Sequence, residues 1–110
     1  MRNKEIRVLI KLVGHKPIKA TIKDDLKILQ DIVGGLIEVV ELTEDIDIIC
    51  NEEGKLEGLL PNINLDYDII VGDIIFCSHD DMGNFTSLTD EQIKRILAEL
   101  KFRDIIDVND

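Results

Sequence analysis

The amino-acid sequence predicts an α+β fold, in which a mostly antiparallel sheet is packed by two helices in the order β-β-α-β-β-β-β-α. Several short runs alternate apolar and polar residues as half-buried strands do, and two stretches repeat apolar residues at helical spacing. Turn signals separate these runs, and no repeat or low-complexity tract interrupts them. The 110 residues, 45% of them hydrophobic, suffice for one core but not for two, so residues 1–110 are predicted to form a single domain.

The first two strands are predicted to form a hairpin. Residues 5–13 and 17–23 both alternate apolar and charged side chains, and the Gly-His-Lys-Pro sequence at 14–17 is typical of a turn. The apolar positions face the core in this reading. The lysines of both runs, Lys11 among them, then form a solvated cationic face.

A short helix is predicted after the hairpin. Asp24 is a plausible N-cap, and apolar residues from Leu26 to Val33 recur at helical spacing. Gly34 and Gly35 end the helix, because glycine readily adopts the positive φ that a helix C-terminus often needs.

Four strands are predicted next, at residues 36–42, 45–50, 55–60 and 68–77. A turn at 51–54 precedes the third of them, and Pro61-Asn62 breaks it. The run 68–77 (DIIVGDIIFC) is almost continuously apolar and β-branched, which indicates a central strand covered on both faces.

The last helix has the strongest local signals. Thr89 and Gln92 match a capping box, and Leu88 is placed to pack against Ile93 as a hydrophobic staple. One apolar stripe follows, over about three turns, at Ile93, Ile96, Leu97 and Leu100.

Charge is distributed unevenly along the chain, whose formal net charge is −10. Residues 1–27 hold eight bases and three acids, whereas residues 28–110 hold five bases and twenty acids. The eight bases are Arg2, Lys4, Arg7, Lys11, Lys16, Lys19, Lys23 and Lys27. They fit either the polar face of an edge hairpin or a surface for a phosphate-bearing ligand or an acidic neighbouring subunit. The acidic remainder argues against binding to duplex nucleic acid.

The sequence also indicates the cellular compartment and whether the protein contacts a membrane. No apolar run is long enough to cross a bilayer, and the N-terminus lacks the apolar core of a signal peptide. Cys50 and Cys77 are the only cysteines and form no CxxC motif. We therefore expect a cytoplasmic protein, without membrane contact, whose two thiols are buried and chemically idle.

Catalytic motifs are weak. Cys77, His79, Asp80 and Asp81 follow the central strand but lack the spacing of a metal site, and Cys77 is too buried in this reading to be a nucleophile. Glu52 and Glu53, with Asp45 and Asp47 nearby, could form a catalytic carboxylate pair, but adjacent residues in a turn usually face water. Nothing else resembles a phosphate-binding loop, a nucleophile elbow or a glycosidase dyad. We expect no catalytic residue, no bound metal and no cofactor, hence no enzyme.

A small-ligand site would need an aromatic face for stacking together with cations or amides for phosphate. The side chains with these properties near the C-terminus are Asn84, Phe85, Lys94, Arg95, Phe102 and Arg103. In the alternative reading Phe85 belongs to the core and Lys94 and Arg95 form an exposed helix face.

Four segments, VGGLIEVVEL (33–42), CNEEGKLEGLLPN (50–62), DIIVGDIIFC (68–77) and SLTDEQI (87–93), resemble a small family of unknown function. Its members are encoded mainly by bacteriophages and mobile elements of Gram-positive bacteria. The resemblance covers roughly residues 5–97. The chain has Pro61-Asn62-Ile63 where members often have Pro-Asn-Arg. The family carries no established catalytic residues.

The resemblance implies an accessory protein that counteracts host defence in the cytoplasm of a bacterial host. One mechanism is sequestration of a nucleotide immune signal in a pocket between protomers of a homo-oligomer. Another is nucleic-acid mimicry by carboxylates at Glu38, Glu41, Glu44, Asp45, Asp47, Glu52, Glu53 and Glu57, aimed at a host defence protein. A third is an adaptor that binds only a protein partner.

Overall fold

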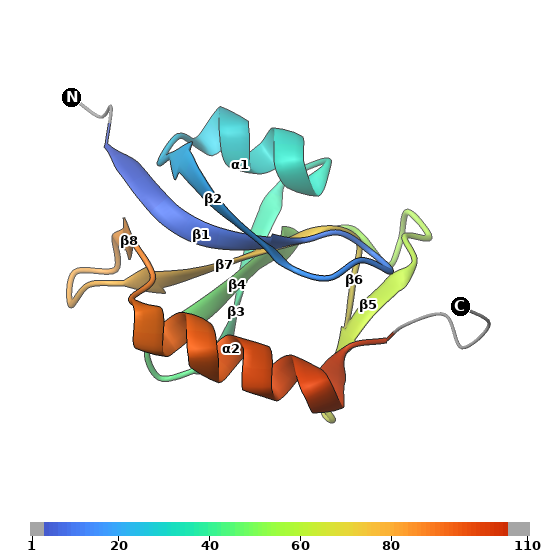
Figure 1. Ribbon diagram of the computed structural model, residues 1–110. Coiled ribbons are helices and arrows are strands. Elements are labelled where there is room, and N and C mark those ends of the chain that lie inside the picture. Colours follow the sequence, from blue (N-terminus) through green and yellow to red (C-terminus); the bar gives the residue numbers. More distant parts are fainter. Residues whose placement is uncertain (1–3, 106–110) are drawn as a thin grey trace.

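The chain folds into three layers, with a central sheet between two helices (Figure 1). The computed structural model describes residues 4–105. Within that range the elements are β1 (Glu5–Lys11), β2 (Ile18–Lys23), α1 (Leu26–Val33), β3 (Ile37–Thr43), β4 (Ile46–Asn51), β5 (Pro61–Asn64), β6 (Ile69–Val71), β7 (Ile74–His79), β8 (Phe85–Thr86) and α2 (Asp90–Arg103). The α+β class and the mostly antiparallel sheet with two helices are confirmed.

The main sheet has the strand order β2-β1-β7-β4-β3, and β8 pairs with the end of β7. Every strand pair is antiparallel. β5 and β6 form a separate two-stranded ribbon. β7 lies at the centre and is buried from Ile74 to Ser78, which confirms that this part of the chain is a strand covered on both faces.

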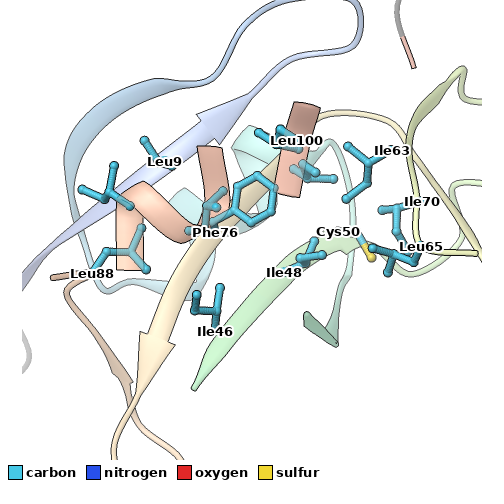
Figure 2. Close-up of a cluster of buried hydrophobic side chains, with 13 residues drawn as sticks. Leu9, Ile46, Ile48, Cys50, Ile63, Leu65, Ile70, Phe76, Leu88 and Leu100 are labelled. Carbon is cyan, nitrogen blue, oxygen red and sulfur yellow. The ribbon is translucent and has the colours of Figure 1, made fainter. Parts of the chain in front are cut away.

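Alternate residues of the central strands supply two cores. Phe76 and Ile48 belong to the larger core, which includes the buried stripe of α2 and the β5–β6 ribbon (Figure 2). Ile75 and Ile49 belong to the smaller core, which is closed by Leu29 and Val33 of α1. The sheet is thus covered on both faces, and little of it remains for water except at the edges.

The predicted N-terminal hairpin is present, with β1 and β2 joined through the turn at 12–17. The prediction that Lys11 faces solvent is wrong, because its side chain is 0% exposed. β1 is an inner strand, and the β5–β6 ribbon and the end of α2 reach over its last residue. Arg2 lies outside the described residues.

α1 begins one residue later than predicted. Asp25, and not Asp24, is the N-cap, because its extended backbone lets its carboxylate accept a hydrogen bond from the Lys27 amide. The predicted stop is confirmed, since Gly34 has φ +83° and closes the helix in the left-handed conformation.

The middle of the chain differs most from the predictions. Residues 55–60 are not a strand, since 52–58 form a turn in which Leu56 is 88% exposed. Pro61 begins β5 instead of breaking a strand, a position that proline tolerates because it needs no ladder hydrogen bond there. The run 68–77 divides at Gly72, whose φ of +80° turns the chain from the ribbon into the main sheet.

α2 follows its predicted start closely. Thr89 is the N-cap, and its side chain and that of Gln92 bond reciprocally to the backbone in a capping box. Ile93, Ile96 and Leu100 are buried, whereas Leu97 is 42% exposed. No helix among the described residues has the length and apolar character needed to cross a membrane.

Candidate functional site

A groove of about 410 Å³ lies between the β1–β2 turn and the C-terminal half of α2. We call it the lysine groove; its lining residues are Lys16, Pro17, Leu97, Leu100, Lys101 and Asp104. The volume falls within the range of about 300 to 1,000 Å³ that small-ligand sites occupy. Its apolar residues can contact a flat apolar group of a ligand, and the ammonium groups of Lys16 and Lys101 can bind an anionic group of the same ligand.

The geometry of α2 explains why lysines line this side. At about 100° per residue, Lys94, Leu97 and Lys101 fall on one flank of the helix, beside the buried stripe that ends at Leu100. The turn that carries Lys16 and Pro17 approaches that flank. Long lysine stems can cover the exposed part of Leu97 while their charged ends stay in water.

The negative charge of Asp104, in the lining of the lysine groove, is neutralised by a buried lysine. Asp104 forms an ion pair of 2.8 Å with the buried Nζ of Lys11, which also donates to Oδ1 of Asn62 at 2.6 Å. Asn62 in turn donates to the carbonyls of Lys11 at 3.0 Å and Gly72 at 2.7 Å. Because Asp104 is already paired, the charge that the groove presents to a ligand comes from Lys16 and Lys101.

The opposite flank of α2 carries the two predicted arginines, and both are engaged within the chain. Arg95 binds the Asp45 carboxylate through Nη1 at 3.2 Å and Nη2 at 2.6 Å. That hydrogen-bonded guanidinium is the main cause that holds the pKa of Asp45 well below its usual range. Arg103 bonds to Glu99 and Asp66. Neither guanidinium is free for a phosphate in this arrangement.

The other predicted ligand residues lie apart from one another. Phe85, on β8, packs against the core beneath α1, as the alternative reading had it. Asn84 lies in the loop before β8 and bonds to Asp80. Phe102, in the last turn of α2, points away from the core and is 88% exposed. None of the six predicted residues lines the lysine groove, and Lys94 is the one that shares the helix flank of Leu97 and Lys101.

The chain's thiols sit in the cores. Burial raises the pKa of Cys50 to about 11 and that of Cys77 to about 12, so both remain protonated at neutral pH. His79 bonds through Nδ1 to Asp47 at 2.9 Å. In the part of the chain that the structure describes, no group of three or more His, Cys, Asp or Glu side chains gathers as a metal site would require.

Lys16 is one of the eight N-terminal bases predicted for a phosphate-bearing ligand or an acidic subunit, whereas Leu97 and Lys101 were not predicted as groove residues. One signal was available, because Lys94, Leu97 and Lys101 have the i, i+3, i+7 spacing of one helix flank. The approach of the hairpin turn to that flank had no local signal. It depends on the order of strands in the sheet.

Comparison with known proteins places the chain by family alone. No curated protein and no solved structure matches it at a significant level. Residues 6–101 match the family described as "Domain of unknown function (DUF3846)". That match spans both helices nearly completely and every strand of the main sheet. The chain therefore belongs to the DUF3846 family, whose function is unknown.

Proposed function

We propose that the protein is a non-catalytic binding protein that sequesters a nucleotide-type anion in the lysine groove. The observation that carries this proposal is the combination of Pro17, Leu97 and Leu100 with two lysines around one hollow of about 410 Å³. A base or sugar would cover the apolar residues, and the phosphates would lie between Lys16 and Lys101.

Local charge supports an anion there even though the chain as a whole is acidic. Lys94, which is exposed, lies on the same flank of α2 as Leu97 and Lys101 and adds a third positive charge beside the groove. The field near a cluster of cations is set mainly by charges within about 10 Å at physiological salt, so the distant carboxylates contribute little.

The biological setting is part of the proposal. The resemblance to phage and mobile-element proteins favours an accessory protein that withdraws a nucleotide immune signal in the cytoplasm of a bacterial host. The lysine groove is open to solvent, and a second copy placed over it would enclose the ligand in a homo-oligomer. Sequestration of a ligand requires no nucleophile or acid–base group. The proposal is therefore compatible with two cysteines that stay protonated and with two arginines that are bonded within the chain.

A thermal-shift panel of linear and cyclic nucleotides, including ADP-ribose derivatives, tests the proposal at low salt. A ligand at 100 times its Kd adds about 2.7 kcal/mol to the free energy of unfolding, which raises the Tm of a domain of this size by several degrees. The variant Lys16→Glu/Lys101→Glu should lose that increase.

The matched control is Lys23→Glu/Lys27→Glu, which makes the same change of charge at two exposed lysines that do not line the groove. It should keep most of the response. A flat panel, or equal losses in the two variants, would contradict the proposal and leave the acidic surface, with its predicted role as a nucleic-acid mimic, as the next candidate.

A further inference from the structure

A second cavity, unrelated to the lysine groove, opens beside the C-terminal end of α1. It has a volume of about 480 Å³, and we call it the glycine cleft because Gly34, Gly58 and Gly72 form part of its wall. Apolar side chains such as Leu60, which is 66% exposed, supply much of the rest. A neighbouring hollow of about 540 Å³ shares Asp31 and Gly34 with it.

The walls of the glycine cleft are held firmly. The buried side chain of Asn51 donates to the carbonyl of Val33 at 3.3 Å and accepts from the Glu53 amide at 2.8 Å. Gly72 approaches Leu59 so closely that an added Cβ would lie 2.7 Å from its Cδ1. The cleft is therefore part of the packed fold and not a gap between loosely placed loops.

The charged side chains that line the glycine cleft and the adjoining hollow are all acidic. Asp31 and Asp73 line the cleft, Glu53 and Glu57 line the adjoining hollow, and no lysine or arginine among the described residues lines either one. Lys27 offsets Asp31 from outside, at 2.6 Å. The C-terminal end of α1, which lacks a basic residue in its last turn, adds partial negative charge from its carbonyls.

We propose that the glycine cleft docks a lysine- or arginine-bearing segment of a partner protein. The cation would meet the carboxylates and the end of α1, while an apolar neighbour in the segment would cover Leu60. Exposed glycine backbone lets a peptide chain approach closely, because no Cβ stands in the way at Gly58. This docking is independent of the nucleotide proposal, since the two cavities share no lining residue.

Fluorescence anisotropy tests the docking with a labelled nine-residue peptide in which Lys, Arg and Leu are separated by Gly and Ser. A second peptide carries Glu in place of Lys and Arg. The basic peptide should bind and the acidic one should not. The triple variant Asp31→Asn/Glu57→Gln/Asp73→Asn should weaken binding of the basic peptide by about tenfold or more.

The control Glu44→Gln/Asp81→Asn/Glu91→Gln removes three exposed carboxylates elsewhere and should change the affinity by less than about twofold. Urea unfolding of each variant checks that the fold is kept. Equal weakening of peptide binding in the two triple variants would show that net charge alone causes the loss, and it would overturn the proposal. The proposal would also be overturned if the acidic peptide bound or if the basic peptide did not. Displacement of the basic peptide by equimolar spermidine would assign the cleft to a small polyamine instead and overturn the protein partner.

Discussion

Single residues in this protein take their roles from the neighbours that the fold gives them. Lys11 occupies a polar position of an alternating strand, yet its side chain is fully buried and its ammonium is held by Asp104 and Asn62. Asn62 is buried as well and connects β1, the bend at Gly72 and the start of the ribbon. These three side chains fix the end of α2 against the sheet and so set one side of the lysine groove.

Asp104→Asn is expected to lower the free energy of unfolding by about 3 kcal/mol, because it leaves the buried ammonium of Lys11 without its counter-charge. Urea unfolding measures the loss. Asp81→Asn, at an exposed position, should change stability by less than about 0.5 kcal/mol. Similar small changes in both variants would show that the ion pair contributes little.

Cys50 and Cys77 should resist alkylation in the folded protein at neutral pH, because burial shields both thiols and raises their pKa values to about 11 and about 12. Mass spectrometry after iodoacetamide treatment should detect no adduct in buffer and two adducts in concentrated urea. Rapid labelling of either thiol under native conditions would contradict this burial.

Asp45 makes stability depend on pH in the acid range. Its pKa is lowered in the folded state by the Arg95 guanidinium, so the stabilisation is complete above the ordinary aspartate pKa and is lost as pH falls below it. Asp45→Asn should be less stable than the wild type at pH 7 and should lose less stability on acidification to about pH 3. Urea unfolding at both pH values checks this, and parallel losses in the two proteins would refute it.

Elements with local signals could be predicted, and elements that depend on distant contacts could not. The capping box of α2 and the glycine stop of α1 lie within a few residues of the helix ends that they define. The division of 68–77 depends on where β6 and β7 find partners, and an apolar run gives no sign of that. Gly72 was the one local hint of a break.

Gly72→Ala tests that break directly. An L-residue at φ +80° is strained by about 1 to 2 kcal/mol, and the new Cβ would also lie 2.7 Å from Leu59 Cδ1. Gly83→Ala is the matched control, with φ +85° and no atom within 4 Å of the added Cβ. Thermal unfolding should show a larger loss for Gly72→Ala, and equal losses would mean that the contact with Leu59 relaxes freely.

The lysine groove and the glycine cleft differ in charge: two lysines and the paired Asp104 line the first, whereas Asp31 and Asp73 are the charged residues that line the second. Residues of α2 line the lysine groove, and residues at the end of α1 line the glycine cleft. These two helices lie on opposite sides of the sheet (Figure 1). Sequence reasoning identified a basic N-terminal segment and cations on the last helix. It could not show that the turn at Lys16 meets the flank of Lys101, because that contact depends on the strand order.

NMR titration of ¹⁵N-labelled protein with the nucleotide panel would show whether the lysine groove binds a nucleotide-type anion. We expect at least one nucleotide to shift the amide signals of Lys16, Leu97 and Lys101, with little change at Gly34 and Gly58 of the glycine cleft. Unchanged spectra with every nucleotide, or shifts centred away from the groove, would contradict it.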